Sequence, residues 1–248
     1  MVKVNETILS LLKNGTSLNK VSSITKLNKS TLYFHYKKLF GKKNKPFVFL
    51  FKNKEERGEF LGIFAGDGSF YLDKKTSHYT ISIATGHYEK EYAEFLKKAF
   101  FDWFNKRPMI YTSQYKGKPS CIRTSYYSKE LYLFIKEYLT WSGKKSYNIC
   151  LKELDLTEKD FNRGFLRGLI DTDGSCYIPK NRVSFSTISK KLAEQASAIM
   201  ESLTNSKPKV YIIKGINEAT LYTVTFHGQP ARELIAIIKP HNQNRKLE

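Results

Sequence analysis

The sequence predicts an α+β protein in which one α-β-β-α-β-β-α unit occurs twice, after a small three-helix domain. Three observations support this: a motif that recurs at an offset of 106 residues, apolar alternation typical of strands after each copy, and leucines at helical spacing before the first copy. The predicted domains are residues 1–45, with a basic linker at their end, and two repeats over 46–150 and 151–248. With 41% apolar residues among 248, the chain can build a sizeable core.

The first domain is expected to contain three short helices. Apolar residues recur at helical spacing from Leu9 to Leu39, and the pattern is broken at Asn14-Gly15. The stretch 17–39 resembles the helix-turn-helix of many DNA-binding proteins, whose second helix lies in the major groove. A three-helix bundle without affinity for DNA is the alternative. The resemblance implies DNA contacts by Lys29, Ser30, Thr31, Tyr33, His35 and Lys37.

The charge of the chain indicates a polyanionic partner. Lys and Arg number 42 against 23 Asp and Glu, a formal net charge of +19. Residues 1–55 hold twelve lysines and two acids, which is the concentration expected where phosphates are neutralised, although a lysine-rich genome would also raise the count. No apolar run is long enough for a membrane span, so an intracellular protein is expected. The three cysteines and five histidines lack the spacing of a disulfide framework or a zinc site.

The strongest observation is the internal repeat. The segment Arg57–Tyr71 matches Arg163–Tyr177 in seven of fifteen positions, and a later match of 107–111 with 207–211 shows that the second copy is about six residues shorter. Each copy is expected to form a helix ending at Asp-Gly, a hairpin, an amphipathic helix, a second hairpin and a final helix. The predicted ranges are 55–66, 69–84, 88–104, 108–127 and 128–139 in the first copy and 159–172, 175–187, 189–203, 208–227 and 230–239 in the second.

Small residues recur every four positions in each predicted first helix. They are Gly58, Gly62 and Gly66 in the first copy and Gly164, Gly168 and Thr172 in the second. Glycine costs about 1 kcal/mol relative to alanine in a helix interior, so the two stripes indicate close packing of one helix against the other. Asp67 and Asp173 would then meet where both helix dipoles are negative, a place that favours a divalent cation. A single Asp-Gly would be an ordinary helix end, but two in register are a stronger signal.

The segments Phe60–Gly68 and Leu166–Gly174 resemble the two motifs of a single-chain LAGLIDADG homing endonuclease, and the resemblance covers about residues 55–246. It implies two pseudo-symmetric repeats that form a DNA-binding saddle. It also implies that Asp67 and Asp173 are the metal-binding aspartates. The motifs depart from the family pattern at two positions.

The first departure is Ala65, which stands where the family motif has its first aspartate, a position that is not a metal ligand. The second is Arg167, which replaces a small residue. Because arginine is bulky on a helix that must pack closely, Arg167 is expected to point away from the small-residue stripe.

The resemblance also implies a lysine near the scissile phosphate late in each repeat. Lys145 lies 78 residues after Asp67, and Lys246 lies 73 residues after Asp173. The neighbours Lys144 and Arg245 are alternatives for these assignments, and an ordinary surface lysine is an alternative at either place.

Alternation in the predicted strands gives a polar sheet face, which together with basic loops suits a ribbon in the major groove. A sheet face that is simply solvated is the alternative. The strand residues predicted to face DNA are Tyr71, Lys75, Thr80, Ser82, Arg123, Ser125, Tyr177, Arg182, Ser184, Ser186, Thr223 and Thr225. The loop residues are Lys116, Lys118, Lys180 and Lys214.

The resemblance thus implies a monomeric, site-specific double-strand DNA endonuclease that uses Mg²⁺ and cuts a long, partly palindromic target. Mn²⁺ is expected to replace Mg²⁺, and Ca²⁺ to support binding without cleavage. One alternative is a DNA- or RNA-binding protein without catalysis on the same scaffold, either a transcription regulator or an intron-splicing maturase. A second alternative is a protein-interaction module with a basic surface. Neither the paired Asp-Gly nor the helix-turn-helix favours this alternative.

Overall fold

The structure is a computed structural model that describes residues 6–41, 47–214 and 219–242. The chain divides into two compact units, Met1–Pro46 and Phe47–Glu248. The second unit contains helices and antiparallel sheets in two matching sets, so the predicted α+β class with a repeated unit is confirmed. None of the helices in the described ranges has the length and apolar character needed to cross a membrane.

The first unit consists of three short helices, α1 (Glu6–Lys13), α2 (Leu18–Thr25) and α3 (Lys29–Phe40). A turn joins α2 to α3, and Lys26 in it adopts the left-handed conformation (φ 57°) that ends α2. The helices pack around a small core made of Ile8, Leu12, Val21 and Leu32. This is the local arrangement that the helix-turn-helix interpretation requires.

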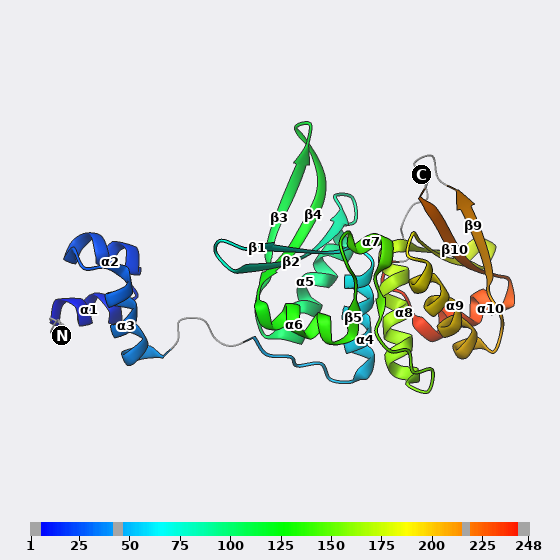
Figure 1. The fold of residues 1–248 in the computed structure, drawn as a ribbon, viewed down its shortest axis with the longest axis horizontal. Helices are drawn as coiled ribbons and strands as arrows, with labels where there is room; N and C mark the ends of the chain where they lie inside the picture. Colours follow the sequence, from blue (N-terminus) through cyan, green and yellow to red (C-terminus); the bar gives the residue numbers. More distant parts are fainter. Residues whose placement is uncertain (1–5, 42–46, 215–218, 243–248) are drawn as a thin grey trace. The chain divides into compact units, whose positions relative to one another are not determined.

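The second unit begins with a phenylalanine-rich segment and continues with the two repeats (Figure 1). The first repeat contains α4 (Lys54–Ala65), β1 (Gly68–Asp73), β2 (His78–Gly86), α5 (Lys90–Phe104), β3 (Met109–Tyr115), β4 (Lys118–Tyr127) and α6 (Lys129–Tyr138). The second contains α8 (Lys159–Asp173), β7 (Gly174–Tyr177), β8 (Arg182–Thr187), α9 (Lys190–Thr204), β9 (Lys209–Lys214), β10 (Thr220–His227) and α10 (Gln229–Ile238). The predicted element bounds agree with these to within a few residues.

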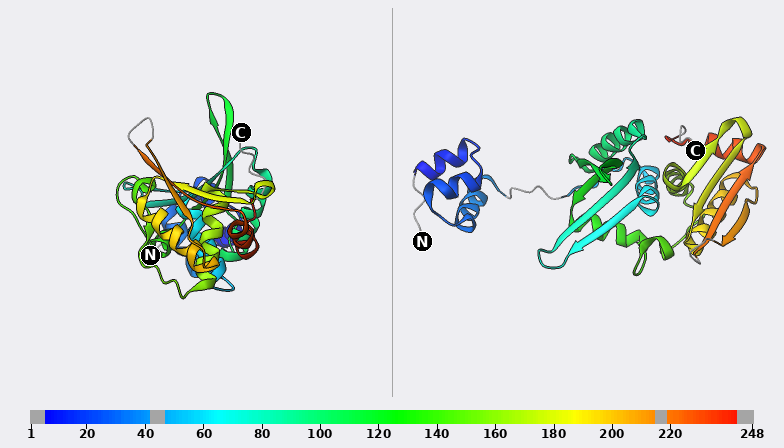
Figure 2. Two further views of the ribbon diagram at one scale, coloured as in Figure 1. Left: turned by 90° about the vertical axis from the view of Figure 1, so that its right-hand side faces the viewer. Right: turned by 90° about the horizontal axis from the view of Figure 1, so that it is seen from above.

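Each repeat forms one four-stranded antiparallel sheet, with the orders β1-β2-β4-β3 and β7-β8-β10-β9. The strands alternate as predicted, because Ile81 and Ile83 of β2 and Phe185 of β8 are buried on the face that packs against helices. Figure 2 shows the two sheets on either side of the central helices. The opposite face of each sheet is left for polar side chains.

Helices α4 and α8 lie side by side at the centre of the second unit (Figures 1 and 2). A Cβ added to Gly58 or Gly62 would overlap main-chain atoms of α8, and one added to Gly164 or Gly168 would overlap main-chain atoms of α4. The glycines therefore allow the two backbones to touch, and the predicted close packing of the two stripes is confirmed.

The segment between the repeats contains elements that the sequence did not predict. Two short strands, β5 (Leu139–Thr140) and β6 (Cys150–Leu151), pair with each other and enclose the four-residue helix α7 (Lys145–Asn148). A single turn of 3-10 helix, Ile178–Lys180, also replaces the simple turn expected between β7 and β8.

The sequence did not predict the partners of Arg167. Its side chain runs along the flank of the helix pair, where it forms ion pairs with Glu55 and Glu59 of α4. The guanidinium can lie there because it extends past the small-residue stripe instead of inserting into it. The bulky residue thus joins the two helices through charge.

Candidate functional site

The two aspartates lie at adjacent C-terminal ends of α4 and α8. Asp67 follows Gly66 in the turn after α4 and is half-buried, whereas Asp173 is the last residue of α8 and is exposed. A Cβ added to Gly66 would lie 3.2 Å from Asp173 Oδ2 and would overlap the side chain of Thr172. The two motif ends are therefore in contact, and both carboxylates lie where the dipoles of their helices are negative.

Lys145 joins this site through α7, of which it is the first residue. Its Nζ donates hydrogen bonds to the carbonyl oxygens of Phe64, Ala65 and Gly66 at 2.7, 2.8 and 2.8 Å. A charged amine thus satisfies the last carbonyl groups of α4, as favoured at a helix C-terminus. Burial lowers the pKa of Lys145 to about 8, although the negative charges of Asp173 and Asp67 oppose that shift.

The neighbouring lysine, Lys144, makes a different contact. Lys144 is exposed, and its Nζ lies 5.1 Å from the centre of the Tyr147 ring. Of the two lysines considered for the first repeat, the geometry therefore brings Lys145 to the ends of the helix pair. Lys246 and Arg245, the corresponding residues of the second repeat, lie outside the described residues.

Asp67 and Asp173 are suited to a hard divalent cation. Over the described residues, no group of three or more His, Cys, Asp or Glu side chains is arranged to hold a metal ion. Mg²⁺ commonly binds through one or two carboxylates, water and phosphate oxygens. The donor set at the helix ends fits an ion that binds together with a phosphodiester.

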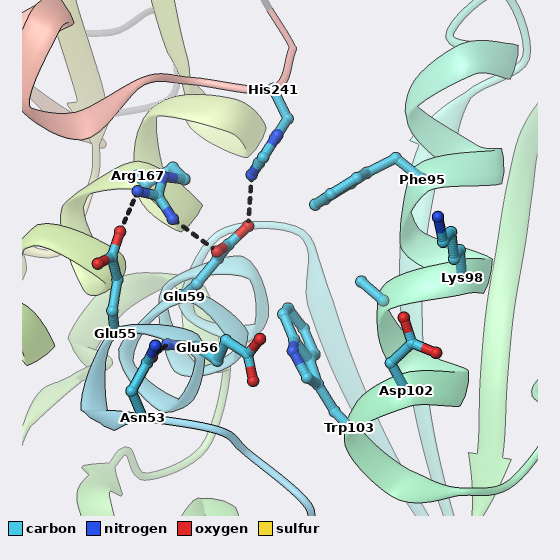
Figure 3. A pocket seen from close by; sticks show the side chains of 11 residues that line it. Asn53, Glu55, Glu56, Glu59, Phe95, Lys98, Asp102, Trp103, Arg167 and His241 are labelled. Carbon is cyan, nitrogen blue, oxygen red and sulfur yellow. Dashed lines mark hydrogen bonds and ion pairs between the residues drawn. The ribbon is translucent and has the colours of Figure 1, made fainter.

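A second polar cluster lies further along the helix pair, on the flank that faces the open pocket of Figure 3. Glu59 of α4 is buried, and its carboxylate lies between Arg167 Nη1 at 2.9 Å and His241 Nε2 at 3.1 Å. Glu55 pairs with both Arg167 and Arg163, which lowers the pKa of the Glu55 carboxyl through these hydrogen bonds despite its partial burial. No pattern in the sequence predicted this cluster.

Asp171 and the C-terminal segment extend the same cluster. Asp171 stands where the first motif has Ala65, and that difference was the one signal in the sequence that pointed to it. Burial raises the pKa of Asp171 to about 6, while hydrogen bonds from Asn242 and His241 and the charge of His241 oppose the shift. Residues of the C-terminal segment therefore contact both buried acids, His241 beside Glu59 and Asn242 on Asp171.

The outer faces of the sheets hold most of the side chains that were predicted to contact DNA. Exposed residues in this set are Tyr71, Lys75, Lys116, Lys118, Tyr177, Lys180, Arg182 and Lys214, and the half-buried residues are Thr80, Arg123, Ser186 and Thr223. The strand register adds Tyr111 and Tyr211, which lie beside Arg123 and Thr223 and are also exposed. These two tyrosines were not predicted; they lie on the edge strands β3 and β9, and along β9 every residue is exposed, so burial does not alternate there.

Four predicted contact residues are buried instead: Ser82, Ser125, Ser184 and Thr225. The hydroxyls of Ser82 and Ser125 lie 2.7 Å apart and bond each other, and Ser184 bonds Ser175 at 2.8 Å. The hydroxyls of Ser82, Ser125 and Ser184 thus bond between adjacent strands, and all four residues are shielded from solvent.

In the first unit, the residues that the helix-turn-helix resemblance implies as DNA contacts lie on α3, which begins at Lys29. Lys29, Ser30, Tyr33 and Lys37 are exposed, and Thr31 and His35 are half-buried. The exposed face also carries Phe34, which is 58% exposed and was not predicted to take part in binding.

Comparisons with known proteins agree with this geometry. Residues 160–238 match the family model of a LAGLIDADG-like domain. No curated protein matches the chain.

Solved structures share the fold at low sequence identity. Mesophilic variants of the homing endonuclease I-DmoI match with a TM-score of 0.53 and 17% identity over 77% of this chain and 98% of theirs. The complex of I-DmoI with DNA and Mn matches with a TM-score of 0.55 and 16% identity over 76% of this chain and 98% of that one. Full-length DUF199/WhiA from Thermatoga maritima matches with a TM-score of 0.50 and 16% identity over 77% of this chain and 57% of that one.

Proposed function

Because this chain contains a LAGLIDADG-like domain, we propose that it is a site-specific double-strand DNA endonuclease that requires a divalent metal ion. One observation supports this above all: two carboxylates from different repeats, Asp67 and Asp173, meet at adjacent helix ends with the amine of Lys145 beside them. A purely structural helix pair gains nothing from like charges placed together at the negative ends of two dipoles.

Asp67 and Asp173 hold Mg²⁺ in this proposal, together with water and phosphate oxygens. Bound there, the ion would supply Lewis-acid activation of the attacking water and of the scissile phosphate. I-DmoI has been solved in complex with DNA together with Mn, Mg or Ca, which supports Mn²⁺ and Ca²⁺ as test ions for this chain.

Lys145 places a positive charge beside both carboxylates. In the absence of DNA its three N–H groups all donate to carbonyl oxygens of α4, so a direct bond to a phosphate would have to replace one of them. Its first effect is therefore to fix the turn that carries Asp67 and to reduce the repulsion between the two carboxylates.

The sheets supply the DNA-binding surface. Their outer faces carry Tyr71, Arg123 and Arg182 with the basic loops at their ends, and the chain as a whole has a net charge of +19. Phosphates would be neutralised by the loop lysines, and strand side chains would contact base edges. Since the two repeats differ in sequence, the target of the monomer would be long and only partly palindromic.

The first test needs no knowledge of the target. The protein is incubated with the DNA that flanks its gene and with a randomised duplex library, in Mg²⁺ or in EDTA, and the ends produced are sequenced. A single site cut on both strands in Mg²⁺ and intact in EDTA is the expected result. Tight, sequence-selective binding with no cleavage in Mg²⁺ or Mn²⁺ would instead support the DNA- or RNA-binding alternative on this scaffold.

A further inference from the structure

The connector between the two repeats forms a short hairpin that carries Lys145 at its tip. Strands β5 and β6 pair in antiparallel register, with Thr140 opposite Cys150. Two positions further along the same register, Ser142 stands opposite Asn148, and Lys145 is the middle residue of the loop between them. Because the lysine lies at the tip, the way in which this loop closes decides where its amine reaches.

Asn148 closes this loop with its side chain. Its main chain belongs to α7 and does not continue the ladder of β5 and β6. Instead, its Oδ1 accepts from the main-chain N–H of Ser142 at 2.9 Å, and its Nδ2 donates to the carbonyl oxygen of Ser142 at 2.9 Å. A carboxamide bonded to both main-chain groups of one residue reproduces one rung of an antiparallel ladder. A further contact, from Nδ2 to Ser142 Oγ, is longer at 3.3 Å.

The base of the hairpin is held by the second repeat. Gln195 of α9 accepts from the main-chain N–H of Leu151 and donates to its carbonyl oxygen, both at 2.9 Å. Ser189, the N-cap of α9, donates from Oγ to the carbonyl oxygen of Ile149 at 2.7 Å. Both side chains are buried, so these bonds are shielded from water. The base is therefore fixed independently of Asn148, which acts only on the tip.

The amine of Lys145 needs a fixed approach, because its three N–H groups donate to the last carbonyl oxygens of α4. Burial does little to hold the loop that carries it, since Ser142 and Asn148 are exposed and Gly143 adopts a positive φ of 54°. Hydrogen bonds must therefore restrain the tip. The two bonds from the Asn148 carboxamide to the main chain of Ser142 supply this restraint.

We propose that Asn148 is a positioning residue: its side chain closes the loop 142–148 and so holds the amine of Lys145 against the end of α4. Asp67 follows that end directly, so the loop also determines where a positive charge lies beside this carboxylate. For its consequence in cleavage the inference rests on the proposed endonuclease function. Asn148 itself contacts neither metal nor DNA in this role.

The placement of Lys145 is tested on the full chain without DNA. A brief acetylation modifies the amines that the reagent can reach, and mass spectrometry gives the rates at Lys145 and at its exposed neighbour Lys144. Asn148→Ala removes both bonds to the main chain of Ser142, so Lys145 should be acetylated about fivefold to thirtyfold faster, with Lys144 unchanged. Ser142→Ala is the matched control. It removes only the longer contact to Oγ and should leave both rates unchanged.

An acetylation rate of Lys145 that is the same in Asn148→Ala as in the unaltered chain would overturn the inference. Faster acetylation of lysines throughout the chain would also overturn it, because that pattern marks a general loss of structure. Since Asn148 is exposed and the base of the hairpin is held by α9, the unfolding temperature of the variant should stay close to that of the unaltered protein.

The consequence for the reaction is measured on a DNA site that the unaltered protein cuts. Asn148→Ala should slow single-turnover cleavage by a similar factor while binding of the site in Ca²⁺ stays the same, and it should add no further loss to Lys145→Met. Normal cleavage in spite of faster acetylation would overturn the part of Asn148 in the reaction. If the unaltered protein cuts no DNA, the proposed function fails, whereas the acetylation rates still decide whether Asn148 places Lys145.

Discussion

At the scale of single residues, Lys145 connects the two motifs most directly. Its amine satisfies three carbonyl oxygens of α4 and lies near both aspartates. Lys145→Met removes the charge and the donors but keeps a side chain of similar length. We expect single-turnover cleavage to slow by about tenfold to a hundredfold with metal-dependent binding retained. Lys144→Met is the matched control, and an equal effect of that change would remove the role from Lys145.

Asp171 gives a prediction about stability that does not depend on DNA. Its pKa is raised to about 6 in the folded protein, from a reference value of 3.8. Between these values the folded state binds a proton that the unfolded state lacks, so this group destabilises the fold above about pH 6 and the penalty is relieved as pH falls. Asp171→Asn keeps an oxygen that can accept from the N–H of Asn242.

We therefore expect Asp171→Asn to raise the free energy of unfolding at pH 7.5 and to change it less at pH 4.5, measured by urea denaturation in EDTA. A variant that is less stable at pH 7.5 would show that the charged form of Asp171 is favoured by His241 and Asn242 more than burial opposes it.

At the scale of elements, the helix pair depends on bare backbone. Gly62 faces the main chain around Phe165 of α8 so closely that a Cβ would overlap it. On an exposed helix surface Gly→Ala stabilises by up to about 1 kcal/mol, whereas overpacking a close contact costs about 1–3 kcal/mol. We expect Gly62→Ala to destabilise the protein in thermal or urea unfolding, and an increase in stability would contradict the packing of α4 on α8.

The sequence predicted these elements well where a pattern extended over many residues. The two first helices, the amphipathic helices and the hairpins were all found, because glycine spacing and apolar alternation reflect burial directly. It did not predict α7, since four residues carry no periodicity. It also did not predict how segment 239–242 packs, since the contacts of His241 and Asn242 join positions more than 70 residues apart. The ion pairs of Arg167 were not predicted, because its partners Glu55 and Glu59 lie on another helix.

At the scale of the whole molecule, the N-terminal unit is expected to provide a second DNA-binding surface. Residues 1–55 hold twelve lysines against two acids, and α3 exposes Lys29, Tyr33 and Lys37. Removing residues 1–45 should weaken target binding and flatten its dependence on salt, because fewer counterions are released. The cut position should stay the same, since both repeats remain. Fluorescence anisotropy at several salt concentrations measures both quantities, and an unchanged affinity and slope would exclude the unit from the complex.

The most direct measurement compares Asp67→Asn and Asp173→Asn with the unaltered protein on a DNA site that it cuts. Each change removes one carboxylate from the helix ends and leaves the sheet surfaces intact. The control is Asp102→Asn, which alters an exposed carboxylate on α5. We predict that both variants lose double-strand cleavage in Mg²⁺ while binding the site in Ca²⁺ as tightly as before, and that the control keeps both. Full double-strand cleavage by either variant would contradict the assignment of Asp67 and Asp173 as the catalytic metal site.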